Sequence, residues 1–239
     1  MRYLITVSYD GSKYYGFQRL NNENTVQKEL ERALSVINKK SVVVKGAGRT
    51  DRGVHALGQR VHFDLDVDVP KERLINAINS LVDKYIRVTH CEYVNDDFHA
   101  RFLVKKKVYK YVINVGEYDP IKEDYVYNYC KNLDTDSMIL ASRCLIGKHS
   151  YKAFVSGERD NYNSEIYDVN FEISEDFVII RFEGTSFYRY MVRNLVGALM
   201  LVGKNKITVD EFICMIDGDN TYSYLTVPAN GLYLESIEY

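Results

Sequence analysis

The sequence predicts an α+β protein made of two similar halves that share a mostly antiparallel central sheet. Three observations support this fold class. Short runs of alternating apolar residues, typical of strands, recur along the chain, and runs with helical apolar spacing separate them. A strand, helix, strand order occurs twice before residue 103. We therefore expect an N-terminal lobe over residues 1–103 and a C-terminal lobe over residues 104–239.

The first half begins with an alternating run that ends at an Asp10-Gly11 turn signal, and a helix follows that Asn24 or Thr25 can cap. Pro70 opens a second helix, as proline often does at a first turn. The expected strands are 2–9, 42–44, 59–65 and 85–94, and the expected helices are 25–37 and 70–81.

The second half begins with another alternating strand, and a tyrosine-rich polar connection follows it. Its apolar periodicity then predicts helices separated by two short strands, with a last strand close to the C-terminus. The expected strands are 108–115, 169–174, 177–182 and 232–237, and the expected helices are 136–145, 188–202 and 209–216.

Composition limits the classes of function. The four cysteines and five histidines are scattered without metal-ligand spacing, so we expect neither a metal site nor disulfides. The N-terminus has no apolar core of a signal peptide, and arginines interrupt the longest apolar stretch, so we expect a cytoplasmic protein without a membrane partner.

Charge is segregated along the chain, although the formal net charge is only −2. Residues 207–239 contain six acidic residues and no Lys or Arg, whereas residues 101–110 contain five basic residues and no acid. Such a basic run is either the solvated face of a strand or a nucleic-acid contact, and by itself it does not decide between them.

The densest chemical signal is the segment GAGRTDRGVH, residues 46–55, in which three glycines surround one carboxylate, Asp51, with Arg49 and Arg52 on either side. An isolated Asp beside Gly is most often a turn residue or a helix cap. The segment lacks the Lys-Ser/Thr ending of a P-loop and the glycine spacing of a dinucleotide-binding turn. A role for Asp51 therefore depends on the rest of the sequence.

Six motifs in one order resemble those of the tRNA pseudouridine synthase A (TruA) family. They cover both halves of the chain, and their order makes a chance match untenable. The motifs are YDGSKYYGFQR (9–19), GAGRTDRGVHALGQRVHF (46–63), DDFHARF (96–102), YKY (109–111), FYRYMVRNLVG (187–197) and PANGLYL (228–234). The resemblance implies two ferredoxin-like halves in the pseudouridine synthase fold, and isomerisation of uridine to pseudouridine on the 3′ side of the tRNA anticodon stem and loop.

The resemblance also implies roles for single residues. Asp51 is the catalytic carboxylate, acting as a nucleophile or base. Tyr109 stacks on the uracil, Arg193 forms a salt bridge with Asp51, and Arg49 helps to flip the target nucleotide out of the stem. Arg193 also lies at the edge of an apolar helical stripe, where a cation needs a partner. The expected RNA contacts are Lys13, Arg19, Arg52, Lys105, Lys106, Lys107, Lys110 and Arg189.

The implied enzyme is a homodimer that binds tRNA and needs no cofactor, because the isomerisation involves neither redox change nor group transfer. One stretch departs from the family pattern: residues 163–167 contain no arginine where relatives commonly carry an Arg-Thr pair. A divergent paralogue with another RNA target, a catalytically silent tRNA-folding chaperone, and a hydrolase using Asp51 and His55 remain alternatives.

Overall fold

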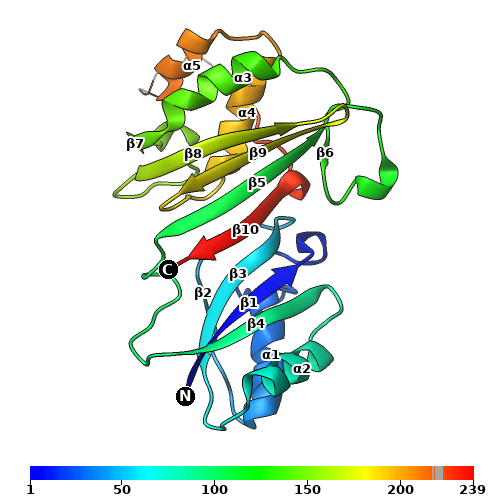
Figure 1. The fold of residues 1–239 in the computed structure, drawn as a ribbon, viewed down its shortest axis with the longest axis vertical. Coiled ribbons are helices and arrows are strands. Elements are labelled where there is room, and N and C mark those ends of the chain that lie inside the picture. Colours follow the sequence, from blue (N-terminus) through cyan, green and yellow to red (C-terminus); the bar gives the residue numbers. More distant parts are fainter. Residues whose placement is uncertain (217, 219–222) are drawn as a thin grey trace. The chain divides into compact units, whose positions relative to one another are not determined.

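The structure, a computed structural model, describes residues 1–216, 218 and 223–239, and the chain divides into two compact units. The first unit comprises Met1–Lys105 and Tyr233–Tyr239, and the second comprises Lys106–Leu232 (Figure 1). Asp217 and Asp219, two of the six acidic residues counted in the C-terminal part, lie outside the described residues.

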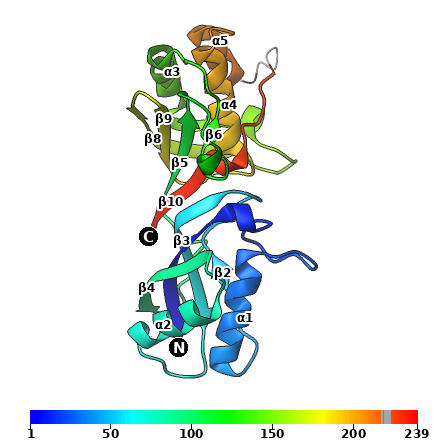
Figure 2. The same ribbon diagram turned by 90° about the vertical axis from the view of Figure 1, so that its right-hand side faces the viewer.

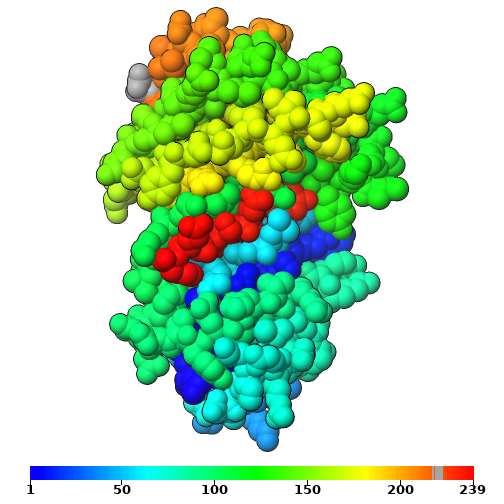
Figure 3. Space-filling view, viewed as in Figure 1, coloured from blue at the N-terminus to red at the C-terminus, as the bar shows by residue number. Residues whose placement is uncertain are grey.

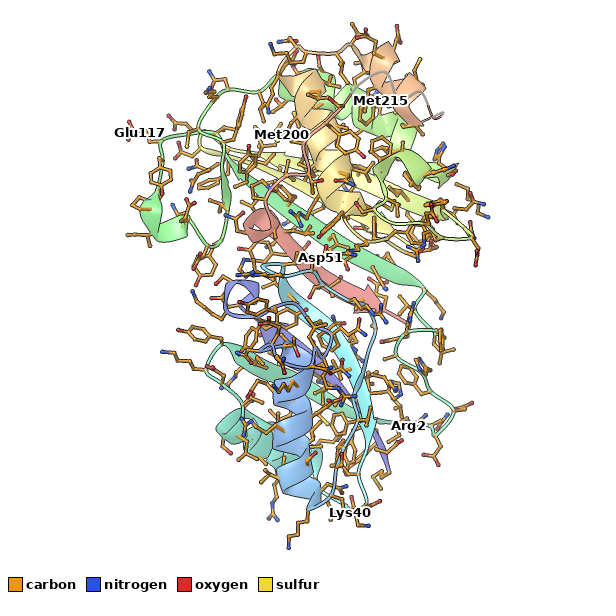
Figure 4. All side chains as sticks on the ribbon, turned by 180° about the vertical axis from the view of Figure 1, so that it is seen from behind. Arg2, Lys40, Asp51, Glu117, Met200 and Met215 are labelled. Carbon is orange, nitrogen blue, oxygen red and sulfur yellow. The ribbon has the colours of Figure 1, made fainter. Side chains whose placement is uncertain are left out.

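The first unit is a mostly antiparallel sheet with helices. Its strands are β1 (Arg2–Tyr9), β2 (Lys45–Gly46), β3 (His55–Asp64), β4 (Ile86–Val94) and β10 (Leu232–Glu238). They lie in the order β4-β1-β3-β10, with β2 also paired to β3, and only β10 is parallel to its partner β3. Helix α1 (Val26–Asn38) crosses one face of this sheet (Figure 4). Helix α2 (Lys71–Leu81) packs against α1 and β4.

The second unit contains an antiparallel sheet in the order β5-β9-β8-β7. Its strands are β5 (Lys106–Asn114), β7 (Gly147–Ser150), β8 (Asn163–Ile173) and β9 (Phe177–Gly184), with the short β6 (Tyr127–Asn128) paired to β5. Helices α3 (Thr135–Ser142), α4 (Met191–Gly203) and α5 (Val209–Ile216) pack together on the unit (Figure 2). In Figure 3 the side chains of β8 and β9 form part of the visible surface of this unit, so none of the described helices covers them there.

The fold class and most elements are confirmed, but several bounds differ from the sequence prediction. The expected strand at 42–44 is wrong, because the N–H groups of Val42 and Val44 donate to the Ser35 Oγ and Glu31 Oε1 of α1 instead of to another strand, at 2.9 and 3.2 Å. The expected helix at 188–202 begins at Met191, because Tyr190 has a φ of 62°, in the left-handed region.

Three further differences concern the length and partners of elements. The strand expected at 59–65 begins at His55, and the one expected at 169–174 begins at Asn163, because its polar first half pairs with β7 and β9. The helix expected at 136–145 ends at Ser142 and continues as a 3₁₀ turn. The first unit ends at Lys105 and also includes Tyr233–Tyr239, whose strand β10 pairs with β3.

Candidate active site

Asp51 lies in the loop between β2 and β3 of the first unit (Figure 4). The two strands form a hairpin, which the Ala47 N–H extends by donating to the Arg60 carbonyl at 2.8 Å. Within the loop, the Val54 N–H donates to the Asp51 carbonyl at 3.1 Å, and the buried Gln59 donates through Nε2 to the Gly48 carbonyl at 2.9 Å. The backbone on both sides of the carboxylate is therefore fixed from within the hairpin.

The segment Tyr9–Phe17 holds the same loop from outside. The hydroxyls of Tyr9 and Thr50 form a buried hydrogen bond at 2.7 Å, and the Phe17 N–H donates to the Thr50 carbonyl at 3.1 Å. Burial raises the pKa of Tyr9 to about 12, against the opposing hydrogen bonds from Thr50 and Gln59, so the phenol stays protonated at neutral pH. The residue before Asp51 is thus connected to the first motif of the sequence through both its side chain and its backbone.

Two glycines of that first motif permit this close approach. A Cβ on Gly11 would lie 2.0 Å from the Val54 carbonyl oxygen, and one on Gly16 would lie 2.6 Å from the Thr50 carbonyl oxygen. Gly16 also has a φ of +89°, which L-residues rarely adopt. The motifs at 9–19 and 46–63 therefore occur together because one packs directly on the other, a role for the first motif that sequence reasoning missed.

His55 has a structural position in this unit. Its side chain is 2% exposed, its Nδ1 accepts a hydrogen bond from the Gly11 N–H at 3.1 Å, and its ring stacks on Tyr233 with centroids 4.7 Å apart. The same Nδ1 lies 3.4 Å from the Asp10 Oδ1, so the ring is held by the first motif. The burial of this ring argues against the hydrolase alternative, in which His55 acts together with Asp51 on an RNA phosphodiester.

The other basic residues predicted in the first unit have different surroundings. The side chains of Arg49 and Arg52 are exposed, and the Arg52 guanidinium lies 4.2 Å from the centroid of the Tyr15 ring. Lys13 is also exposed, with its ammonium 5.8 Å from the Tyr85 ring. Arg19 forms an ion pair with the buried Glu31 at 2.8 Å, so its charge is already compensated.

Tyr109 lies on β5 of the second unit, opposite Phe182 of β9, and only 7% of it is exposed. Its ring meets that of Phe187 edge to face, with centroids 5.2 Å apart. Because side chains alternate along a strand, Lys107 points to the same face as Tyr109, whereas Lys106 and Lys110 point to the other face. On that other face Lys106 pairs with Glu183 at 3.2 Å, so the basic run is divided between two faces of the sheet.

Arg193 is on the first turn of α4 and is partly buried, as its place at the edge of the apolar stripe predicted. Its Nε donates to the Val227 carbonyl at 2.7 Å, and its guanidinium lies 5.0 Å from the centroid of the Tyr190 ring. The exposed Arg189 is at the same distance from that ring. The left-handed Tyr190 thus presents one aromatic ring to both arginines.

Neighbours on α4 hold the segment before β10 in place. Thr226 donates to the Asn194 Oδ1 at 2.7 Å, and a Cβ on Gly197 would lie 2.1 Å from the Leu225 carbonyl oxygen. Tyr111 donates through its hydroxyl to the Pro228 carbonyl at 2.7 Å. Burial raises the pKa of Tyr111 well above its usual value, which the nearby Arg193 opposes. The motifs at 109–111, 187–197 and 228–234 therefore form one packed cluster.

The segment without an arginine is the start of β8. Ser164 is buried, and its hydroxyl donates a hydrogen bond to the Ser186 carbonyl. The same hydroxyl lies 3.1 Å from the Ser186 hydroxyl. In this segment, where relatives commonly carry an Arg-Thr pair, Ser164 is thus a small side chain whose hydroxyl has hydrogen-bond partners.

Asp51 and Arg49 belong to the first unit, whereas Tyr109 and Arg193 belong to the second, so the expected salt bridge between Asp51 and Arg193 stays a prediction. Among the described residues, no group of three His, Cys, Asp or Glu side chains is placed to hold a metal ion. Nor does any helix in the described part of the chain have the length and apolarity to cross a membrane.

A family model described as tRNA pseudouridine synthase matches residues 5–103 and 141–239, which include the whole Asp51 loop and Arg193. The chain belongs to the tRNA pseudouridine synthase family. Tyr109 and the basic residues at 105–110 lie between the two matched ranges, so the family match carries no information on them.

Relatives in the family match over their whole length. The tRNA pseudouridine synthase A of Listeria monocytogenes serotype 4a (strain HCC23) is 38% identical over 245 residues, covering 100% of this chain and 99% of that protein. The protein of the same name from Bacillus subtilis (strain 168) is 36% identical, with the same coverage. The one from Finegoldia magna (strain ATCC 29328) is 36% identical over 239 residues and covers 98% of both chains.

Proposed function

We propose that the chain isomerises uridine to pseudouridine on the 3′ side of the tRNA anticodon stem and loop, with the Asp51 carboxylate acting at C1′ of the target nucleotide. The observation that carries the proposal is the hairpin loop in which Asp51 lies between residues anchored by hydrogen bonds, Gly48, Thr50 and Val54. A catalytic group needs a fixed position relative to the bond that it acts on.

The reaction breaks the N1–C1′ bond, turns the uracil, and joins C5 to C1′, after which the proton on C5 is lost. A carboxylate can attack C1′, stabilise its developing positive charge, or take the proton from C2′. All three routes need the ionised form of Asp51 and an apolar or aromatic surface that holds the detached uracil. Tyr109, a ring set edge to face against Phe187, is our candidate for that surface.

Access to a nucleotide in a stem requires that it be turned out of the stack, which costs a few kcal/mol. Arg49 is two residues from Asp51 and exposed, so its guanidinium can occupy the space left by the base or hold a neighbouring phosphate. Arg193 already donates to the Val227 carbonyl through Nε and retains the other N–H groups of its guanidinium for the Asp51 carboxylate.

We also propose that the enzyme acts as a homodimer in the cytoplasm. With a net charge of −2, one chain offers limited cationic surface to an RNA. Two copies that bind one tRNA together would double the cationic surface available to the RNA.

The test is conversion of a uridine-containing anticodon stem-loop transcript by the purified protein in a buffer with a chelator and no added cofactor. We expect pseudouridine to form, because a carboxylate supplies the chemistry that this isomerisation requires. If activity disappears with the chelator and returns with a divalent ion, while the RNA stays folded throughout, the cofactor-free mechanism is wrong.

A further inference from the structure

A second basic site lies at the end of α4 opposite to Arg193. There a pocket of about 450 Å³ is lined by Tyr129, Lys131, Asp134, Lys204, Asn205 and Lys206, among others. Three lysines from two separate segments thus surround one concave surface, all within the second unit. Lys204 is eleven residues beyond Arg193, which corresponds to roughly 16 Å along a helix. Met200, labelled in Figure 4, marks this end of α4.

The walls of the pocket are fixed to each other. The Asp134 N–H donates to the Gly203 carbonyl at 2.8 Å, which joins the segment before α3 to the end of α4. A Cβ on Gly203 would lie 2.5 Å from the Met138 Sδ, so the two helices are in close contact there. Asn205 has a φ of 54° and turns the chain, and the Lys206 N–H then donates to the Leu201 carbonyl at 2.9 Å. The three lysines therefore project from a rigid frame.

The charge in this pocket is not neutralised within the described part of the chain, where no carboxylate lies within 4.0 Å of an ammonium of Lys131, Lys204 or Lys206. Asp134 lines the pocket, but its carboxylate caps α3, accepting from the Ser137 N–H at 3.0 Å and from the Ser137 hydroxyl at 2.8 Å. Lys204 lies over the Tyr129 ring at 4.6 Å, and burial together with the Lys131 cation lowers its pKa. Lys204 is half-buried whereas Lys131 and Lys206 are exposed, and neighbouring cations of this kind favour an anion between them.

We propose that this pocket binds a phosphate group of the tRNA backbone, away from the nucleotide that is modified. Lysines bind phosphates as point charges, and the amide of Asn205 adds a donor at the rim. The choice of RNA as the source of the phosphate rests on the proposed function, whereas the preference for a phosphate rests on the pocket itself. Such a contact fixes the register of the RNA without reading its sequence.

The test compares two triple variants of the full chain with the wild type. In K131Q/K204Q/K206Q the pocket loses its charge, and in the control K28Q/K39Q/K71Q three lysines of the first unit are changed, so both variants have the same net charge. Binding of full-length tRNA is measured as a function of salt, and thermal melts verify that both variants fold. A third variant, K131R/K204R/K206R, keeps the charge.

We expect the pocket variant to raise the Kd at least about tenfold at low salt and to reduce the slope of log K against log salt by roughly 0.7 to 0.9, the contribution of one phosphate contact. The control should change the slope less, and the arginine variant should bind like the wild type. Single-turnover conversion at saturating enzyme should be unchanged in all variants, so a failure of the proposed catalysis would be visible independently in the wild type.

Equal slopes and affinities for the pocket variant and the control would overturn the proposal. It would also be overturned if inorganic phosphate stabilised the wild type but not the pocket variant against thermal unfolding while tRNA binding stayed the same. In that case the pocket would take a free anion and not the RNA.

Discussion

The hydrogen bond between the buried hydroxyls of Tyr9 and Thr50 shows how single residues position the carboxylate, because Thr50 directly precedes Asp51. Tyr9→Phe removes this bond and leaves the Thr50 hydroxyl unsatisfied. We expect the free energy of unfolding to fall by about 1 to 2 kcal/mol and turnover to fall with it. Urea denaturation and a single-turnover assay measure the two effects.

Tyr14→Phe is the matched control for that change. The Tyr14 hydroxyl is buried, and among the described residues it has no hydrogen-bond partner. Its removal should leave stability unchanged or raise it slightly, because a buried polar atom without a partner is unfavourable. A loss of stability in Tyr14→Phe as large as that in Tyr9→Phe would show that the Tyr9–Thr50 bond has no special role.

His62 predicts how stability depends on pH. Its Nδ1 accepts from the Ala100 N–H at 3.1 Å, which requires the neutral ring. Burial lowers the pKa of His62 to about 4, and His99, Arg2 and Lys45 act in the same direction against Asp64. The pKa of His62 in the folded protein is below its unfolded value of about 6.5. The contribution of the neutral His62 ring to folding stability is therefore complete above about pH 6.5 and is lost as the pH falls towards 4.

Between pH 7 and pH 5 the wild type should therefore lose about 2 kcal/mol through His62 alone. In His62→Gln this contribution is absent, so the variant should be less sensitive to pH, although it is less stable at pH 7. Urea denaturation of both proteins at the two pH values tests the expectation. Parallel losses in the two proteins would assign the pH dependence to other groups.

At the scale of elements, α4 connects Arg193 with the segment before β10. Gly197→Ala has two effects of opposite sign on stability. The higher helix propensity of alanine alone would stabilise the protein by up to about 1 kcal/mol. The added Cβ would destabilise it, because it would lie 2.1 Å from the Leu225 carbonyl oxygen. We expect the steric effect to win, with a net loss of about 1 to 3 kcal/mol and weaker catalysis, because the Arg193–Val227 bond lies in the displaced segment.

Urea denaturation gives the sign for Gly197→Ala directly. A more stable variant would mean that the segment around Leu225 moves without cost, and that its contacts do not hold Arg193.

Elements with strong periodicity could be predicted from the sequence, and the errors have local physical causes. Helix α1 matched within a residue at each end, with Thr25 as the cap that accepts from the Lys28 N–H. The missing strand at 42–44 could not be predicted, because β-branched residues indicate a strand whereas tertiary hydrogen bonds from α1 take its N–H groups. The left-handed backbone conformation of Tyr190 could not be predicted either, because nothing in a tyrosine side chain requires a positive φ.

At the scale of the whole molecule, the division into lobes at residue 103 stays a prediction, and the sequence did not predict the partner of the last strand. Strand pairing between segments far apart in sequence leaves no local pattern, so the pairing of β10 with β3 could not be read from the sequence. The candidate site shows the same limit. The motifs gave Asp51, Arg49, Tyr109 and Arg193 as candidates, but not the hydrogen bonds from Tyr9, Gln59 and Phe17 that hold the loop, nor the division of the lysines by strand alternation.

The central claim is that the Asp51 carboxylate carries out the chemistry while its loop is held by other groups. Asp51→Asn tests it most directly, because the amide keeps the size of the side chain and removes the charge, nucleophilicity and basicity. Single-turnover conversion of an anticodon stem-loop at saturating enzyme is measured together with binding of the same RNA and with urea denaturation. We predict no detectable pseudouridine, with RNA affinity equal to or slightly above that of the wild type and a loss of stability of at most about 3 kcal/mol. Conversion at the wild-type rate would contradict the account and make Asp51 a structural turn residue.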